Sequence, residues 1–386
     1  MPPLLSGGDP GYDARVTEAD ATDPAGVRVV VVGASAGGVP ALTRLVSRLD
    51  GDLVAAVLVV LHLPADGRSL LAGILDRAGP LPAANPRDRE RLVSGQIYVA
   101  PPDQHLLVDD SMVRVTRGPR ENGYRPSVDA LFRSAASWFG PAVTGVVLTG
   151  ALDDGAAGLA EIVRQGGHAI VQDPAEAGVP DMPTHALEAV PDAQVSRLDA
   201  IAQWLNRRVG TGAPTIVEAT RRLDESAAGA ELAVQRGERR YPEDVYREAA
   251  GIACPDCAGS LFVLDEQSRV RFRCRVGHGW TGDALLAAQG RELEQALWAA
   301  IRVLEDGHAV NERLAARASR RGRQAAVQGL EQRRAARERL IAALRSAITH
   351  FGSAGVGDSD DAPRGEHGDF LHDLAAGGVE AEEPLV

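Results

Sequence analysis

Apolar runs alternate with amphipathic segments over the first half of the chain. Short apolar runs, typical of buried strands, lie at residues 27–32, 55–61, 96–100, 143–148 and 168–171. A further run at 106–115 is interrupted by Asp109-Asp110, which predicts a hairpin. Amphipathic segments at 39–49, 128–138 and 158–165 predict helices. Fully apolar strands separated by helices predict an α/β fold, with a doubly wound, mostly parallel sheet covered on both faces.

The pattern changes after about residue 205. Residues 211–249 are polar and weakly periodic, which predicts a linker with some helix. Residues 250–282 contain all the cysteines. Apolar residues recur at helical spacing from 283 to 350, and Arg321-Gly322 is a break, so a helical hairpin is expected there. The complete division is a disordered leader (1–26), an α/β domain (27–210), the linker, a cysteine module (250–282), the hairpin (283–350) and an acidic disordered tail (351–386).

Composition excludes several classes of protein. The net charge of −12 argues against nucleic acid as a partner. No apolar stretch is long enough to span a membrane, and the first residues lack the pattern of a signal peptide. Three cysteines cannot form a disulfide framework. We therefore expect a cytoplasmic protein without membrane insertion.

A small-residue turn directly follows the first apolar run. It reads Gly33-Ala34-Ser35-Ala36-Gly37-Gly38 and precedes a predicted helix. Small neighbours leave the Ser35 hydroxyl unobstructed, and the N–H groups at a helix start can stabilise an oxyanion. These features suit a nucleophile. The same pattern is equally typical of a turn that binds an anion or packs a helix against a strand.

Two other predicted strands also end in polar residues. His62 follows the second apolar run, and Asp153-Asp154 follows the run at 143–148. Because functional residues gather at the carboxyl ends of parallel strands, Ser35, His62 and Asp154 could converge as a Ser-His-Asp triad. Taken singly, such a histidine is more often structural, and Asp-Asp-Gly is more often a helix cap or turn.

Four ordered sequence blocks carry a resemblance to a known family. The blocks are residues 33–38, 59–64, 125–132 (Arg-Pro-Ser-Val-Asp-Ala-Leu-Phe) and 148–158, followed by Gln172-Asp173-Pro174 and Asp181-Met182-Pro183. Together they make residues 27–205 resemble the catalytic domain of chemotaxis protein-glutamate methylesterases, the CheB type. The match covers nearly half of the chain and is far more specific than a lone Gly-x-Ser-x-Gly.

The resemblance implies a role for each matched residue. Ser35 would be the nucleophile, His62 the general base and acid, and Asp154 the group that orients the imidazole. Ala36 and Ala151 would supply or support the oxyanion donors, together with Arg125. The implied activity is hydrolysis of glutamyl methyl esters on a chemoreceptor or similar signalling protein, with glutamine deamidation as a related activity. No cofactor is implied for catalysis.

This sequence departs from the family pattern at several positions. Leu61 replaces the usual glutamine, Ala36 the usual threonine, and Ala151-Leu152 the usual Met-Gly. Backbone donation survives a side-chain change, but a leucine in place of glycine is expected to alter its loop. Familiar members also carry a phosphorylatable receiver domain before the catalytic one. Only about 26 residues precede the first predicted strand, which predicts activity without phosphorylation and control by a different part, such as the C-terminal region.

The cysteine module has the spacing of a metal site. Cys254 and Cys257 form a Cys-x2-Cys pair, and Cys274 and His278 form a Cys-x3-His pair. Thiolates and imidazole at these spacings suit tetrahedral Zn²⁺, and four protein ligands favour a structural ion. Segments 261–264 and 270–273 predict a short hairpin between the pairs. The alternative is a set of buried or redox-active cysteines.

Two other functions compete with the ester hydrolase. The chain could be a catalytically weak signalling scaffold whose metal module and helices form the working surface. It could also be a doubly wound nucleotide-binding protein, but residues 33–38 lack the Gly-x-Gly-x-x-Gly spacing. The sequence therefore favours a protein-glutamate methylesterase.

Overall fold

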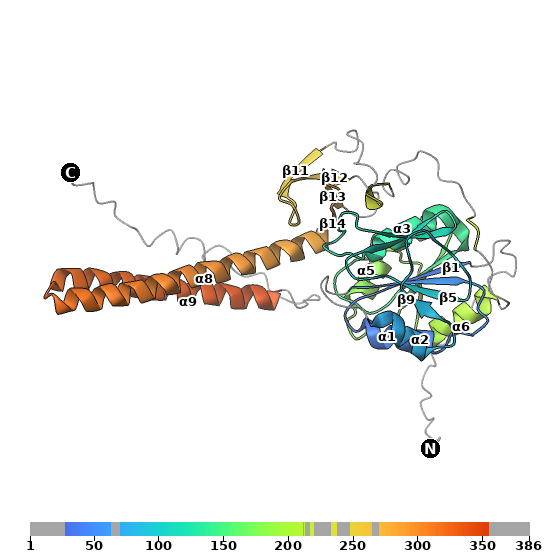
Figure 1. Ribbon diagram of the computed structural model, residues 1–386, viewed down its shortest axis with the longest axis horizontal. Helices are drawn as coiled ribbons and strands as arrows, with labels where there is room; N and C mark the ends of the chain where they lie inside the picture. The colour runs from blue at the N-terminus through green and yellow to red at the C-terminus, as the bar shows by residue number, and fades with distance from the viewer. Residues whose placement is uncertain are drawn as a thin grey trace, which may run out of the picture. The chain divides into compact units, whose positions relative to one another are not determined.

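A parallel β-sheet forms the centre of the computed structural model (Figure 1). The structure describes residues 28–62, 70–210, 212, 217–219, 233–237, 248–264 and 270–354. Among them, seven strands pair in the order β10-β9-β8-β1-β2-β5-β3, and every pairing is parallel. The strands are β1 (Val29–Ala34), β2 (Ala56–Leu61), β3 (Ala83–Ala84), β5 (Gln96–Val99), β8 (Val143–Val147), β9 (His168–Gln172) and β10 (Gln194–Ser196). The predicted parallel sheet is thus confirmed.

Both faces of the sheet are buried, which explains the uninterrupted apolar runs. Along β1, Val30 and Val32 point into one core cluster, whereas Val29 and Val31 point into the other. Successive side chains of a strand face opposite sides, so a strand covered on both sides has no polar position to alternate with.

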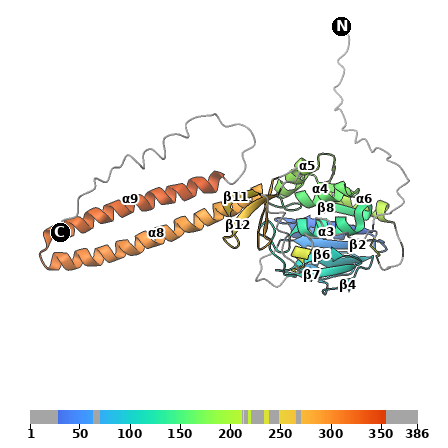
Figure 2. The same ribbon diagram turned by 90° about the horizontal axis from the view of Figure 1, so that it is seen from above.

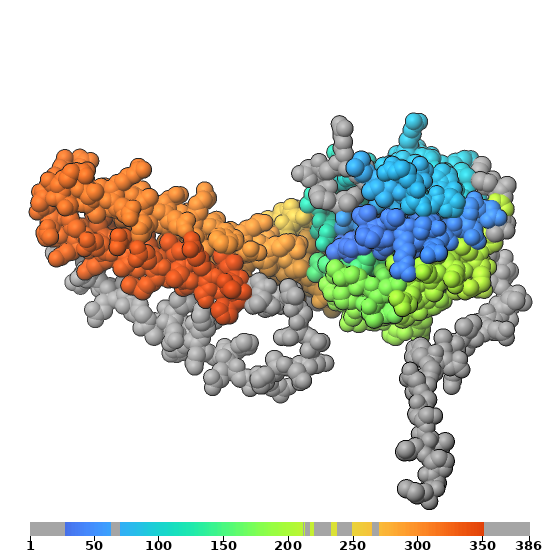
Figure 3. Space-filling model, turned by 90° about the horizontal axis from the view of Figure 1, so that it is seen from below, coloured from blue at the N-terminus to red at the C-terminus, as the bar shows by residue number. Residues whose placement is uncertain are grey.

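Three helices cover each face (Figure 1). Helices α1 (Gly38–Val46), α2 (Leu71–Ala78) and α6 (Leu198–Val209) contribute to the first cluster. Helices α3 (Val128–Phe139), α4 (Ala156–Arg164) and α5 (Asp181–Ala189) contribute to the second. Figure 3 shows the first face, where the blue α1 region lies between the cyan α2 region and the yellow-green α6 region. Segments far apart in sequence therefore share one layer.

A small antiparallel sheet packs beside α3 (Figure 2). It consists of β4 (Glu90–Arg91), β7 (Met112–Thr116) and β6 (His105–Asp109), in that order. Asp110, with a φ of 57°, lies in the turn between β6 and β7, so the predicted hairpin is confirmed. The Ser134 hydroxyl of α3 accepts the Val108 N–H of β6 at 3.0 Å. A 3-10 turn, η1 (Gly140–Ala142), connects α3 to β8.

The cysteine module forms a second antiparallel sheet. Its strands are β11 (Glu248–Ala253), β12 (Ser260–Leu264), β13 (Arg271–Cys274) and β14 (Gly279–Thr281), paired in that order. The described chain divides into two compact units, of which the first ends at Gln289 and includes this sheet together with the α/β domain.

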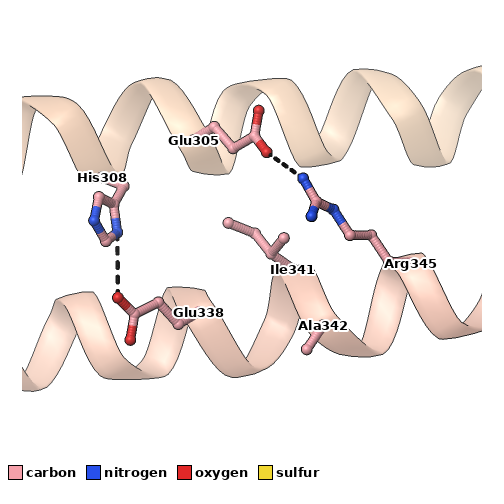
Figure 4. Close-up of a pocket in the computed structure, with 6 residues that line it drawn as sticks. All are labelled: Glu305, His308, Glu338, Ile341, Ala342 and Arg345. Carbon is pink, nitrogen blue, oxygen red and sulfur yellow. Dashed lines mark hydrogen bonds and ion pairs between the residues drawn. The ribbon is translucent and has the colours of Figure 1, made fainter.

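Two long helices make up the described part of the second unit. They are α8 (Gly282–Arg320), whose first turns belong to the first unit, and α9 (Gln324–Ala354). The predicted break lies between them at Gly322, whose φ is 67°. In the groove between the helices, Arg345 pairs with Glu305 at 2.8 Å and His308 lies 4.0 Å from Glu338 (Figure 4). These exposed pairs contribute little to stability.

Some predictions fall outside the described residues. They concern the leader, most of the linker and of the acidic tail, and Leu63 and Pro64 of the histidine block. Within the described part of the chain, no helix combines the length and the apolar character needed to cross a membrane.

Candidate active site

Three polar side chains meet at the carboxyl ends of neighbouring strands. Ser35 directly follows β1, His62 directly follows β2, and Asp154 lies in the loop after β8. These strands are adjacent in the sheet, with β1 in the middle. From β1 the strands follow one another outward on both sides, with β2 and β5 on one side and β8, β9 and β10 on the other. In doubly wound sheets, a crevice that binds ligands lies at the carboxyl ends of the strands at such a switch point. The three residues predicted to converge are thus brought together.

A hydrogen-bonded chain connects the three side chains. The Nδ1 atom of His62 lies 3.1 Å from the Ser35 hydroxyl, and its Nε2 atom lies 2.7 Å from Asp154 Oδ2. Because an ionised carboxylate only accepts, Nε2 donates to Asp154 and Nδ1 accepts from the serine. The imidazole is therefore arranged to take the serine proton.

Asp154 is fully buried yet well provided with donors. It accepts the N–H groups of Val128 at 2.7 Å and Asp129 at 3.2 Å, and the hydroxyl of Ser127 at 3.0 Å. Burial by itself raises its pKa, but the hydrogen bond and charge of His62 and the Val128 N–H outweigh burial, so the pKa of Asp154 is lowered overall. Asp154 is therefore the ionised member of the site.

A second buried carboxyl group lies beside Asp154. Burial, and then the charge of Asp154, raise the pKa of Asp129 to about 8. Its Oδ1 atom accepts the N–H groups of Gly155 at 3.0 Å and Gly158 at 2.6 Å, which anchors the start of α4. The pKa of Asp129 is thus raised and that of Asp154 lowered. Asp129 is therefore neutral near pH 7, and Asp154 carries the charge.

An aromatic ring supports the histidine. Tyr124 stacks on His62 with ring centroids 3.7 Å apart. Tyr124 follows a tight turn in which Asn122 and Gly123 both have positive φ, 54° and 77°. Sequence reasoning missed this group of residues. The Asn-Gly pair was the signal for the turn, since these residues favour two consecutive positive φ values.

The turn at Ser35 requires small residues. Gly37 has a φ of 74° and caps the N-terminus of α1. A Cβ on Gly150 would lie 2.8 Å from the Ser35 Cβ atom, so the loop after β8 can approach Ser35 only without a side chain. Thr149 joins the two loops, because its hydroxyl donates to the Ala36 carbonyl at 2.9 Å and its own carbonyl accepts the Ser35 N–H at 3.0 Å.

Two backbone N–H groups are available near Ser35. Among the described residues, no protein acceptor takes the N–H of Ala36 or Ala151. Ala36 directly follows the serine and is exposed. Leu152, where the resembled pattern has glycine, adopts a left-handed φ of 64°, and its carbonyl lies 3.0 Å from His185 Nδ1. The loop thus has a backbone conformation that favours glycine, although it carries leucine there.

Arg125 has a different environment from the other predicted site residues. Its guanidinium donates to Asp103 at 2.7 Å and 3.0 Å and to the Gly118 carbonyl at 2.8 Å. These contacts fasten the loop before α3. No described contact joins its guanidinium to Ser35, His62 or Asp154.

The predicted metal ligands form a cluster in the module. The ligand atoms of Cys254, Cys257, Cys274 and His278 all lie within 4.8 Å of one another. The Cys257 and Cys274 sulfurs are 3.6 Å apart, and His278 Nδ1 lies 3.7 Å from the Cys254 sulfur and 3.6 Å from that of Cys274.

The cluster fits a tetrahedral ion. Zinc–sulfur bonds of about 2.3 Å place two thiolates about 3.8 Å apart in a tetrahedron, close to the spacing here. Cys254 and Cys274 are buried, whereas Cys257 lies at the surface. The donor set and its spacing therefore suit Zn²⁺.

Comparison with known proteins relates residues 30–205 to a family model described as CheB methylesterase. A putative protein-glutamate methylesterase/protein-glutamine glutaminase of Leptospira interrogans is 37% identical over 179 residues, which cover 46% of this chain and 93% of that protein. Protein-glutamate methylesterase/protein-glutamine glutaminase 3 of Anaeromyxobacter dehalogenans is 40% identical over 213 residues, 53% of this chain.

The chain spans only 61% of the Anaeromyxobacter protein, and 51% of a relative with the same function in its name from Symbiobacterium thermophilum. The crystal structure of the Thermotoga maritima CheB methylesterase catalytic domain is 29% identical in sequence. The matched region covers 47% of this chain and 98% of the Thermotoga chain, with a TM-score of 0.45.

Proposed function

This chain belongs to the CheB methylesterase family, and we propose on that basis that it hydrolyses glutamyl methyl esters on a chemoreceptor or a similar signalling protein. The observation that supports the proposal most strongly is the chain of hydrogen bonds from Ser35 through His62 to Asp154, at 3.1 Å and 2.7 Å. The residue types, their order and their distances are those that nucleophilic ester hydrolysis needs.

Each side chain has a defined part in the proposed reaction. Ser35 Oγ attacks the ester carbonyl carbon while His62 Nδ1 accepts its proton. Collapse of the tetrahedral intermediate breaks the bond to the methoxy oxygen, and His62 returns the proton so that methanol leaves. Water then attacks the acyl-serine, again with His62 as base, and releases the glutamate. Asp154, ionised and held by its N–H donors, stabilises the imidazolium in both halves.

The developing oxyanion needs donors that are already in place. We assign this role to the backbone N–H groups of Ala36 and Ala151, which lie in the two loops joined by Thr149. Because the backbone supplies the hydrogen bond, the alanines at these positions do not prevent catalysis.

Glutamine deamidation uses the same steps, with ammonia in place of methanol as the leaving group. The names of the relatives include this activity. No cofactor takes part in either reaction. Cys254, Cys257, Cys274 and His278 would hold a structural Zn²⁺ in the module, with all four positions filled by protein. We place the protein in the cytoplasm, where the signalling region of a receptor is accessible.

Methanol release from a methyl-labelled receptor fragment tests the proposal. The full-length chain should release labelled methanol, and a fragment with glutamine at the same positions should gain acid groups that mass spectrometry detects. A fragment carrying unlabelled glutamate is the control. Binding to the methylated fragment with no release above the uncatalysed rate would instead support the signalling scaffold.

A further inference from the structure

One turn of the α/β domain connects Asp154, the proposed triad aspartate, to the metal module. This turn, residues 120–124, contains Asn122, whose side-chain amide contacts both sides. Its Nδ2 atom donates to Asp154 Oδ1 at 3.1 Å and to Asp129 at 3.2 Å. Its Oδ1 atom accepts the backbone N–H of Thr281, in β14, at 2.9 Å. Asn122 is 2% exposed, so water does not substitute for these partners.

The backbone of the turn continues the sheet of the module. The Asn122 N–H donates to the Gly279 carbonyl at 2.8 Å, and the Gly279 N–H donates to the Arg120 carbonyl at 3.1 Å. Gly279 directly follows the metal ligand His278. The position of β14 is therefore fixed on one side by the metal cluster and on the other by the turn that holds Asp154 and presents Tyr124 to His62.

A second bond reaches the same loop. The Thr281 hydroxyl donates to Asp153 Oδ1 at 2.8 Å, and Asp153 is the buried residue directly before Asp154. Thr281 thus makes two contacts. Its side chain bonds Asp153, in the loop that carries Asp154, and its backbone N–H bonds the side chain of Asn122.

A buried charge cluster also connects the α/β domain to the module. Glu121, 1% exposed, pairs with Arg133 of α3 at 2.5 Å and with Arg271 of β13 at 2.6 Å. Arg273, two residues along β13 and next to Cys274, lies 3.7 Å from the same carboxylate. Buried charges are stable only while their partners stay in place, so a displaced β13 would separate Arg271 and Arg273 from Glu121 and leave that carboxylate with Arg133.

We propose that Asn122 and Thr281 are positioning residues for Asp154, and that a soft divalent cation of the zinc type, bound at the Cys254–His278 cluster, controls ester hydrolysis through them. Metal binding orders β13 and β14, because a module this small gains its folding free energy from the ion. Ordered β14 fixes the Asn122 turn, which in turn fixes Asp154 and Tyr124. Loss of the metal releases this support without touching Ser35. The effect on catalysis rests on the proposed function, whereas the structural coupling does not.

Hydrogen exchange on the full-length chain tests the coupling without any substrate. Zinc-loaded protein is compared with protein treated with a chelator under reducing conditions, with zinc measured by elemental analysis. Amides at 118–126 and 150–158 should exchange about tenfold faster without the metal, and those of α2 and α6 should not change. Failure of the chain to bind zinc would overturn the proposal. Exchange rates at 118–126 and 150–158 that stay the same after zinc is lost would also overturn it.

Substitutions separate positioning from general stability. In Asn122→Ala, metal removal should change exchange at 150–158 much less than in wild type, because the Asn122 connection is broken and only the Thr281–Asp153 bond remains. Asn206→Ala, which removes a half-buried amide of α6 that bonds Asp50 and Arg48, should keep the full metal effect. Thr281→Val should lower kcat about tenfold with KM unchanged, and Thr281→Ser should restore it. A full metal effect in Asn122→Ala would contradict the proposal.

Activity is measured on the same samples. Zinc removal should lower methanol release and zinc addition should restore it. If zinc-loaded wild-type protein releases no methanol, the proposed function fails, and the exchange comparison still decides whether metal and Asp154 are coupled. If it is active and zinc removal leaves the rate unchanged, control by the metal is wrong while the proposed function stands.

Discussion

Tyr124 lies flat on His62, with ring centroids 3.7 Å apart and ring planes only 4° from parallel. The histidine side chain is 4% exposed, so one of its faces is closed by the tyrosine and its two nitrogens are taken by Ser35 and Asp154. An imidazole that must accept and return a proton without changing position benefits from such a restraint.

The ring of Tyr124, rather than its hydroxyl, is expected to matter. Tyr124→Ala should lower kcat about tenfold, since a stacked aromatic pair is worth about 1 kcal/mol and its loss lets the imidazole rotate. Tyr124→Phe keeps the ring and should stay close to wild type. Steady-state methanol release measures both variants. A Phe variant as slow as the Ala variant would assign the effect to the hydroxyl.

Leu152 occupies a backbone conformation that costs about 1 kcal/mol for any residue with a Cβ. Leu152→Gly should therefore raise the free energy of unfolding by about 0.5 kcal/mol, because the greater freedom of glycine in the unfolded chain offsets part of the relieved strain. Urea unfolding at unchanged m-value measures this. Leu152→Ala keeps the Cβ and is the matched control. It should show no gain, and a gain as large as that of glycine would exclude backbone strain as the cause.

The raised pKa of Asp129 predicts how stability varies with pH. Its pKa is about 8 in the folded chain against 3.8 for a free side chain, so the folded state holds the proton more tightly. The stability that Asp129 contributes is fully present below pH 3.8 and is lost as the pH rises to about 8. The loss is on the order of a few kcal/mol.

Asp129→Asn removes this titration. The variant also loses the acceptor for Asn122, but that cost is the same at every pH. From pH 4 to pH 8, the unfolding free energy of wild type should therefore fall relative to that of the variant. Asp181→Asn, at an exposed position of α5, is the control and should run parallel to wild type. A constant difference for Asp129→Asn would mean that Asp129 is already ionised.

Much of the fold follows from local patterns. The apolar runs predicted the strands because a strand buried on both faces has no polar alternation, as the opposite directions of Val29 and Val30 show. Convergence of Ser35, His62 and Asp154 was also predictable, since parallel strands present the same end. Their catalytic roles stay predictions.

Other features depend on contacts that no local pattern encodes. Asn122 and Thr281 are 159 positions apart, and their hydrogen bond exists only because β14 lies beside the turn. The contacts of Arg125 likewise could not be read from its block, because its guanidinium donates to Asp103 and to the Gly118 carbonyl, which lie outside it. The sequence suggested that Leu152 alters its loop, and the structure shows a left-handed backbone at that position.

Methanol release by Ser35→Ala tests the central claim most directly. The variant removes only the hydroxyl that contacts His62, so the fold should remain, as circular dichroism and zinc content would show. We expect release from a methyl-labelled receptor fragment to fall to the uncatalysed rate. His62→Ala should cost about as much, and the double variant little more, since such residues act as a unit. Release by Ser35→Ala at the wild-type rate would contradict ester hydrolysis through Ser35.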